Sequence, residues 1–210
     1  MKITEVSRLR RSLYRLDLEG LNSIEVDVRT FDESPYREGQ DITEEQLNTL
    51  LAASRYNRAR ERALYLLGLR DYACKELEQK LYTEADPDTA AAVVERLRQV
   101  GLLDDERYAA RLARSLSEVK HYPRRRIEQE LHRRGISSVL AQDAVSALEG
   151  EDFQQALALL EKKYYNKLND PDSRRRVTAA LARRGFSYGA IRRAFNALDI
   201  PDDPDDEETC

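Results

Sequence analysis

Apolar and polar residues alternate over about the first thirty positions, which is the period of strands in a sheet with one buried face. Three stretches show this alternation, at residues 3–9, 12–18 and 23–30. Gly20, Leu21 and Asn22 lie between the second and third stretches and are typical of a turn. The segment DESPYREGQD, residues 32–41, is predicted to be a loop. The sequence therefore predicts a small strand-rich amino-terminal part.

From Thr43 the spacing of apolar residues changes to three and four, as in amphipathic helices. Thr43 is followed three places later by Gln46, and this pair is the pattern of a capping box at the start of a helix. The helical spacing continues to Leu198. Most of the chain is therefore predicted to be α-helical.

The helical region repeats itself. The stretches RRRIEQELHRRGISSVLAQDAVSAL and RRRVTAALARRGFSYGAIRRAFNAL start at Arg124 and Arg174 and match at an offset of 50 positions. An earlier unit ends its second helix at Leu81, again 50 positions before its counterpart. Each unit is interpreted as three helices, and units of this size must stack on their neighbours to bury their faces. The fold class is therefore mainly α: three tandem three-helix repeats in an elongated curved array, with a small β-rich N-terminal part.

This interpretation predicts five parts of the chain. They are a strand-rich extension (1–42), a linker helix with the first repeat (43–103), the second repeat (104–150), the third repeat (151–198) and a disordered acidic tail (199–210). Charge is distributed unevenly among them. Residues 55–198 hold 28 basic and 21 acidic side chains, whereas residues 199–210 hold seven acidic side chains and no basic one. The net charge of −4 therefore hides a basic helical region.

An Arg-Arg-Gly sequence ends the second helix of the second unit and of the third unit, and it has a structural interpretation. If Gly135 is the first residue beyond its helix, Leu131 and Ile136 are placed for the hydrophobic contact of a Schellman ending. Ser137 can then cap the next helix, and the third unit repeats the arrangement around Gly185. The arginines before these glycines lie where the helix dipole favours cations, by about 0.3–1 kcal/mol each. Both a capping role and a binding role remain open for them.

The arginine triplets that open these helices are harder to explain structurally. One follows Pro123, which suits the first helical position, and the other follows Ser173, which can act as a cap. Cations in the first turn of a helix oppose its dipole. The same local conflict at equivalent places in two repeats favours a role in binding an anionic partner. The alternative is neutralisation by nearby carboxylates, which are Asp170, Asp172, Glu128 and Glu130.

Spacing places Arg126 and Arg133 on one flank of their helix, beside the core positions, and Arg176 and Arg183 likewise. We call the predicted set of partner-binding or nucleic-acid-binding residues the basic strip. Its members are Arg124, Arg125, Arg126, Arg133, Arg134, Arg174, Arg175, Arg176, Arg183, Arg184, Arg192 and Arg193. The first repeat lacks this pattern and has Ala85 in place of the glycine.

No catalytic set, phosphate-binding glycine loop or metal-ligand spacing is found in the sequence. The two histidines, His121 and His132, have no other ligands at suitable spacing. We therefore expect no enzymatic activity, no cofactor, no metal and no small-molecule substrate. No apolar run is long enough to cross a membrane, the start has no apolar leader, and two cysteines make no disulfide framework. A cytoplasmic protein with no membrane partner is expected.

The segments LLDDERYAARLARSLSEVKHYPRRRIEQELHRRGI and ALALLEKKYYNKLNDPDSRRRVTAALARRGFSYGAIRRAF closely resemble the bacterial RecX family. ALYLLGLRDYACKELEQKL resembles its first repeat, so the likeness covers roughly residues 55–198. The resemblance implies three three-helix repeats that bind the recombinase RecA, chiefly its filament on single-stranded DNA, and modulate, most simply inhibit, its activity in DNA repair and recombination. Single-stranded or double-stranded DNA is a further partner that it implies.

The chain departs from the family pattern at three places. His121 stands where glycine is common, Ala73 stands near a usual serine, and the first repeat lacks its glycine ending. A second function stays open: a helical repeat protein that binds DNA or RNA directly, without a dedicated recombinase partner. An exposed aromatic platform would favour it for single strands. Tyr122, Tyr164 and Tyr165 are the candidates, and each is expected to pack in the core instead.

Overall fold

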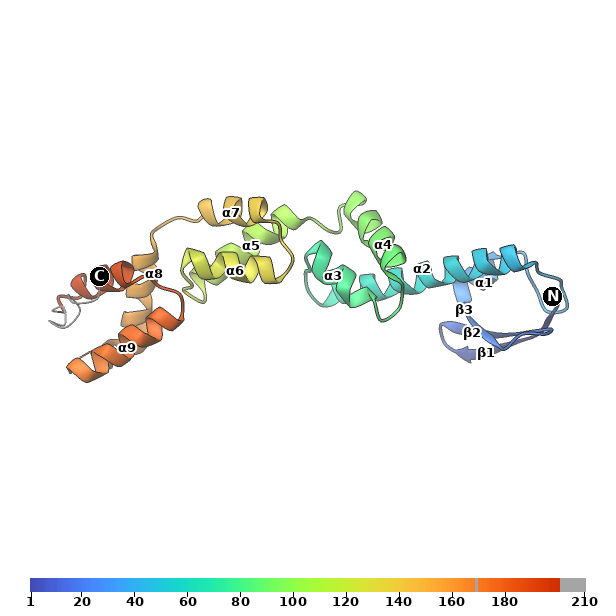
Figure 1. Ribbon diagram of the computed structural model, residues 1–210, viewed down its shortest axis with the longest axis horizontal. Coiled ribbons are helices and arrows are strands. Elements are labelled where there is room, and N and C mark those ends of the chain that lie inside the picture. Colours follow the sequence, from blue (N-terminus) through green and yellow to red (C-terminus); the bar gives the residue numbers. More distant parts are fainter. Residues whose placement is uncertain (169, 201–210) are drawn as a thin grey trace. The chain divides into compact units, whose positions relative to one another are not determined.

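The fold is seen in a computed structural model that describes residues 1–168 and 170–200 (Figure 1). These residues form three strands, ten α-helices, one π-helical turn and one 3-10 turn. They divide into two compact units, of which the first ends at Leu103 and the second begins at Asp104. The predicted class, mainly α with a small amino-terminal sheet, is confirmed.

The amino-terminal sheet is antiparallel, with strand order β1-β2-β3. Its strands are β1 (Ile3–Arg10), β2 (Leu13–Leu18) and β3 (Ile24–Asp27). Alternate residues Leu16 and Leu18 of β2 are buried, as the period-two pattern predicted, whereas β1 departs from strict alternation at its register shifts. The buried side chains of the sheet form one core with residues of the following helices. Gly20 has φ 83° and lies in the turn before β3, which confirms the predicted turn.

Helix α1 (Val28–Glu33) overlaps the end of the predicted strand at residues 23–30 and the start of the predicted loop at residues 32–41. The prediction was wrong here because a local cap outweighs the alternation. The Asp27 Oδ1 atom accepts hydrogen bonds from both the amide and the hydroxyl of Thr30, each at 3.0 Å. These bonds satisfy the start of a helix and end β3.

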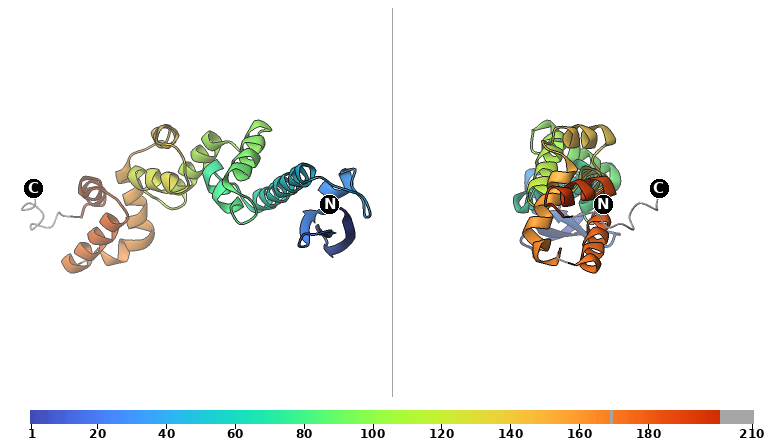
Figure 2. Two further views of the ribbon diagram at one scale, coloured as in Figure 1. Left: turned by 45° about the vertical axis from the view of Figure 1, so that its right-hand side comes forward. Right: turned by 90° about the vertical axis from the view of Figure 1, so that its left-hand side faces the viewer.

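Helix α2 (Glu44–Leu69) begins at the predicted capping box, which is complete. It runs without interruption from beside the sheet into the first repeat (Figure 2). Leu47 and Leu50 belong to the sheet core, whereas Ala63 and Leu66 belong to the core of the first repeat. Between them, the buried Ser54 Oγ atom accepts a hydrogen bond of 2.7 Å from the backbone N–H of Asp27. One helix therefore contributes to two cores.

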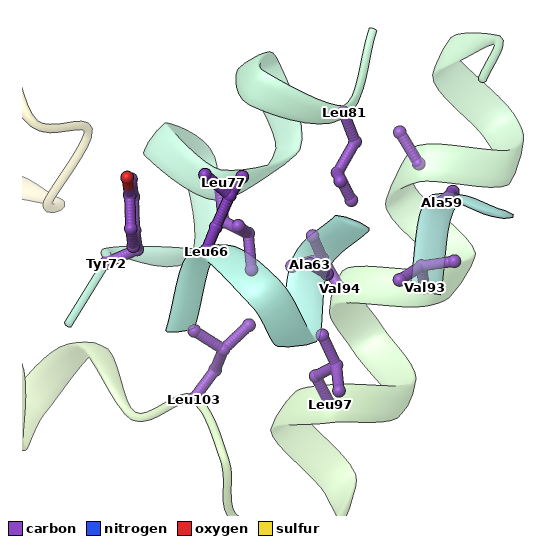
Figure 3. Close-up of a cluster of buried hydrophobic side chains, with 11 residues drawn as sticks. Ala59, Ala63, Leu66, Tyr72, Leu77, Leu81, Val93, Val94, Leu97 and Leu103 are labelled. Atoms are coloured by element: carbon purple, nitrogen blue, oxygen red, sulfur yellow. The ribbon is translucent and has the colours of Figure 1, made fainter. Parts of the chain in front are cut away.

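The first repeat consists of the second half of α2 with α3 (Cys74–Leu81) and α4 (Pro87–Gln99). Figure 3 shows aliphatic side chains from all three helices meeting in one core. Ala73 stands at the N-cap of α3 and supplies no side-chain cap. The helix ends at Tyr82 in a right-handed conformation, as expected for the unit without the glycine.

The second unit holds the other two repeats. The second repeat comprises α5 (Asp105–Glu118), α6 (Arg124–Arg133) and α7 (Ser138–Ser146). The third comprises α8 (Asp152–Leu159), α9 (Pro171–Arg183) and α10 (Tyr188–Asn196). Between α8 and α9 lie the π-helical turn η1 (Leu160–Tyr164) and the 3-10 turn η2 (Tyr165–Lys167).

The predicted Schellman endings are confirmed in α6 and α9. Gly135 and Gly185 have φ of 84° and 98°. The Ile136 N–H bonds to the carbonyl of Leu131 at 3.2 Å, and the same bond recurs from Phe186 at 3.3 Å. The next helices begin with the predicted serine caps. The Arg-Arg-Gly sequence is therefore a helix-ending device in both repeats.

The folded chain continues past Leu198, where the third repeat was predicted to end. Asp199 has φ 55°, and the Ile200 N–H bonds to the Phe195 carbonyl at 3.2 Å. Ile200 also packs against the core of the third repeat. Asp199 and Ile200, which the sequence analysis placed in the acidic tail, are therefore joined to the end of the third repeat. The rest of the expected acidic tail, residues 201–210, lies outside the described residues.

No helix in the described part of the chain combines the length and apolar character needed to cross a membrane.

Candidate partner-binding surface

Arg124 is the first residue of α6, and Pro123 is its N-cap rather than its first helical residue. The Arg124 Nη2 atom donates to the carbonyls of Leu148, at 2.7 Å, and Gly150, at 2.9 Å. The backbone N–H of Arg124 donates to the Asp152 Oδ1 atom at 2.9 Å. Arg124 therefore ties the second repeat to the third. Arg124 therefore has a structural role, unlike the binding role that the sequence favoured for the whole triplet.

Arg126 and Arg133 lie on one flank of α6, as predicted, and both pair with Glu130. The Arg126 Nη2 atom is 3.8 Å from one carboxylate oxygen of Glu130, and Arg133 bonds to the other. Arg126 also lies over the ring of Tyr122, at 5.1 Å from its centroid. One carboxylate therefore offsets charge from two arginines of the strip, so the neutralisation alternative holds for part of the second repeat.

Arg134 lies at the end of α6 and donates to the Tyr108 hydroxyl at 2.9 Å, which links α6 to α5. Arg125 is exposed on the first turn of the same helix. Within the described residues, no carboxylate lies within ion-pair distance of Arg125. Arg125 is therefore the member of the opening triplet that is available to a partner.

The second triplet does not lie in a first turn, which corrects the prediction. Asp170, not Ser173, is the N-cap of α9, and the helix begins at Pro171. Arg174, Arg175 and Arg176 therefore follow in the second turn. Hydrogen bonds from the hydroxyl and the amide of Ser173 hold the pKa of Asp170 below its ordinary value, and nearby Arg176 adds to this effect. The conflict with the helix dipole thus exists in α6 and not in α9.

The two repeats differ in the number of carboxylates that follow their arginine triplets in the sequence. Thr178 and Ala180 stand in α9 where α6 has Glu128 and Glu130. From residue 174 to residue 198 the chain holds seven arginines and no carboxylate side chain, whereas the matching stretch 124–148 holds five arginines and three carboxylates. The positive part of the basic strip is therefore concentrated in the third repeat.

The end of α9 packs close to the start of α6. A Cβ atom added at Gly185 would lie 3.5 Å from the Pro123 Cγ atom and 3.6 Å from the Arg126 Cβ atom. The arginines before Gly185 therefore lie beside the opening of α6, although the two segments are about 60 positions apart in the sequence. Arg183 is exposed there, and within the described residues it has no carboxylate partner.

Arg124 also lines an open crevice with Arg192 and Arg193 of α10. Arg193 pairs with Glu151 and lies over the Phe153 ring, at 4.0 Å from its centroid. The structure thus brings the α10 arginines beside α6, and it supports the grouping of the second and third repeats into one basic region.

Sequence reasoning missed a second group of cations, at the end of α8. Tyr165 is 64% exposed there, between exposed lysines, so the expectation that it packs in the core was wrong. Tyr164 does pack against the core of the third repeat, and it is half-buried. The signal that could have revealed this group is the cluster of lysines and tyrosines in KKYYNK, residues 162–167, where the apolar spacing of the helix breaks down.

The side chain of His121 faces Gln155, with 3.1 Å between the Nδ1 and Oε1 atoms, and His132 lies near Glu128. Among the residues that the structure describes, no three histidine, cysteine, aspartate or glutamate side chains gather as a metal site requires.

Three family models match the chain in succession. They describe the first, second and third three-helix domains of RecX, and they match residues 59–97, 104–145 and 149–195. The matched segments coincide with the three repeats seen in the structure. Solved structures share the fold. A crystal structure of regulatory protein RecX aligns with a TM-score of 0.66 at 22% identity, over 93% of this chain and 100% of its own.

RecX from Lactobacillus salivarius aligns with a TM-score of 0.61 at 23% identity, over 71% of this chain and 99% of its own. Curated relatives carry the name Regulatory protein RecX. That of Trichlorobacter lovleyi is 35% identical over 139 residues, covering 63% of this chain and 90% of the relative. That of Xanthomonas citri is 36% identical over 136 residues, covering 64% and 83%. With these matches across all three repeats, the chain belongs to the RecX family of regulatory proteins.

Proposed function

We propose that this chain is a cytoplasmic regulator that binds the recombinase RecA, chiefly its filament on single-stranded DNA, and inhibits its activity in DNA repair and recombination. Membership of the RecX family supports a regulatory role. The observation that carries the proposal furthest is the local charge of the third repeat: residues 174–198 hold seven arginines and no carboxylate side chain, and Arg176 and Arg183 among them are exposed. A nucleoprotein filament offers phosphates and acidic side chains to such a surface.

No catalytic role is part of this proposal. The arginines would act by holding the partner, because guanidinium groups bind phosphate and carboxylate oxygens through paired hydrogen bonds. Arg125, Arg176 and Arg183 are exposed and are the members of the strip that we assign to the partner. Arg124 and Arg134 hold the repeats and helices together, so their loss would affect binding indirectly.

The test compares binding of the protein to RecA filaments on single-stranded DNA with binding to bare DNA, across a salt series. The double variant Arg176→Gln/Arg183→Gln should bind filaments several-fold more weakly and with a flatter salt dependence, since fewer counterions are released. It should also inhibit the DNA-dependent ATPase activity of RecA less. The matched control, Lys80→Gln/Arg96→Gln, removes two exposed charges from the first repeat and should leave binding unchanged.

Equal affinity for filament and bare DNA would contradict the proposal and support the second candidate, direct binding of nucleic acid without a recombinase. A double variant that inhibits RecA as well as the unchanged protein does would show that the basic strip has another role.

A further inference from the structure

The first helix of the third repeat ends irregularly. After α8 the chain passes through the π-helical turn η1 and the 3-10 turn η2, and α9 begins only at Pro171. The corresponding helix of the second repeat, α5, stays α-helical throughout its 14 residues. π-Helical turns are rare and frequently mark functional sites, because they turn side chains away from the face that the regular helix would give them.

The irregular turns place two adjacent tyrosines in different environments. Tyr164 packs against the core, whereas Tyr165 is 64% exposed. The hydroxyl of Tyr82, another exposed tyrosine, donates to the Glu78 Oε1 atom at 2.8 Å. The hydroxyl of Tyr165 has no hydrogen-bond partner among residues 1–168 and 170–200. The Tyr165 ring therefore has no packing or bonding role that would explain its position on the surface.

Three exposed lysines, Lys162, Lys163 and Lys167, surround Tyr165 in the sequence. Within the part of the chain that the structure describes, none of them has a carboxylate within ion-pair distance. The single carboxylate side chain of residues 160–168 is Glu161. An exposed aromatic ring flanked by unneutralised cations is the combination that proteins use to bind single-stranded nucleic acid.

The turn η2 also contacts α9, and Leu168 and Val177 share one core. The turn η2, which carries Lys167, therefore lies beside α9, the helix that carries the exposed Arg176. Asp170 and Asp172 lie at the start of the same helix, and Asp170 accepts the Ser173 N–H at 2.9 Å as its cap. The cations at this end of the third repeat outnumber the carboxylates even when both aspartates are included.

We propose that Tyr165, Lys162, Lys163, Lys167 and Arg176 form a binding site for single-stranded nucleic acid. A base stacks on the face of Tyr165, and the ammonium and guanidinium groups contact the phosphates on either side. Stacking requires an exposed base face, which a duplex interior does not offer, and it tolerates any base. This inference rests on the proposed function in one respect. We identify the bound strand as the single-stranded DNA of the RecA filament.

The absence of tryptophan from all 210 residues makes a local test available. Tyr165→Trp introduces a single tryptophan, whose emission should be quenched when an oligothymidylate is added to the full chain at low salt. Tyr82→Trp is the matched control. Tyr82 is also exposed, at 47%, but it is bonded to a glutamate in the first repeat, so the emission of a tryptophan there should stay unchanged.

Affinity gives a second readout, by anisotropy of the labelled oligonucleotide without RecA. Tyr165→Ala should weaken binding roughly 5- to 150-fold, the range that loss of one stacked base produces. Tyr165→Phe should bind almost as well as tyrosine, and Tyr82→Ala should have no effect. Changing the three lysines to glutamine should lower the slope of log affinity against log salt by about 2, at roughly 0.7 per phosphate contact.

The proposal is overturned if the protein does not bind the oligonucleotide, if Tyr165→Trp is not quenched, or if Tyr165→Ala binds as tightly as the unchanged protein. Thermal unfolding followed by circular dichroism checks that each variant is folded. If Tyr165→Ala weakens binding to RecA filaments but not to bare strands, the site contacts protein and the inference is wrong. If bare strands show the Tyr165 effects while RecA is neither bound nor inhibited, the inference stands and the proposed function fails.

Discussion

His121 has φ 51°, a left-handed backbone that side chains with a Cβ atom adopt at a cost of about 1–2 kcal/mol. It follows α5 and lies where the resemblance to the RecX family led us to expect glycine. A left-handed backbone is the conformation that glycine adopts without this cost. The His121 side chain lies within hydrogen-bond distance of Gln155, so part of the strain is offset by a contact with the third repeat.

We expect His121→Gly to be more stable than His121→Ala by about 1 kcal/mol. Both variants lose the contact with Gln155, but only alanine keeps the strain of a Cβ atom in the left-handed region. Urea unfolding followed by circular dichroism measures the difference. Equal stabilities of the two variants would show that the backbone at this position is not strained.

The arginines at the start of α6 should differ in their effects on stability. Arg124→Gln should lower the free energy of unfolding by about 1.5–3 kcal/mol, because charged hydrogen bonds to two carbonyls at the end of α7 are lost. Arg125→Gln removes the same charge from an exposed first-turn position, and it should leave stability equal or slightly higher, since the dipole disfavours a cation there. Denaturant unfolding of both variants checks this contrast. Similar losses in the two variants would contradict it.

At the residue scale, local patterns were predictable and long-range partners were not. The pairing of Leu131 with Ile136 around Gly135 follows from spacing within one helix end. The contact of Arg124 with Leu148 and Gly150 joins segments more than 20 residues apart, and no local pattern encodes it. The exposure of Tyr165 likewise depends on where the irregular turns place its side chain.

At the scale of elements, capping aspartates decided the boundaries that the sequence analysis placed wrongly. Asp27 starts a helix inside an alternating stretch, and Asp170 starts α9 four residues before its arginines. Both signals are present in the sequence, as an aspartate three residues before a threonine or serine. They were missed because alternation and the repeat offset favoured other interpretations. The capping box at Thr43 and the serine caps, which had no such competitor, were predicted correctly.

The end of α10 gives a test at this scale. A chain ending at Leu198 should be less stable than a chain ending at Ile200, by about 1 kcal/mol. The shorter chain loses the Ile200 contact with the core and the hydrogen bond to Phe195. Thermal unfolding of the two chains compares them directly. Identical midpoints would mean that the last two residues add nothing to the third repeat.

At the scale of the whole molecule, the 50-residue offset revealed the three repeats, but it gave no sign that the amino-terminal part and the first repeat share a helix. A sequence pattern gives the period of the apolar residues in one segment and does not say which other segment they contact. The apolar residues of α2 have the same helical spacing beside both cores. Leu50 and Leu66 occupy the same helix and serve two different clusters. Which apolar residues belong to which core depends on tertiary packing.

Because the sheet core and the core of the first repeat both include residues of α2, we expect the sheet and the first repeat to unfold together. Leu50→Ala should destabilise this first unit by roughly 2–5 kcal/mol, and amide hydrogen exchange should rise in α3 and α4 as well as in the sheet. The matched control is Leu131→Ala, at a leucine that is also buried but belongs to the second repeat, and it should leave exchange in α3 and α4 unchanged. Unaltered exchange in α3 and α4 of Leu50→Ala would show that the two cores open separately.

The continuity of α2 also restricts how such a gene can be rearranged. A crossover between residues 44 and 69 would cut through a helix that two cores require, and both products would lose part of a core. A crossover near Leu103 would fall between compact units and leave each core whole. We therefore expect duplication or exchange of segments to be tolerated after the first repeat, and the sheet to be kept together with that repeat as one piece.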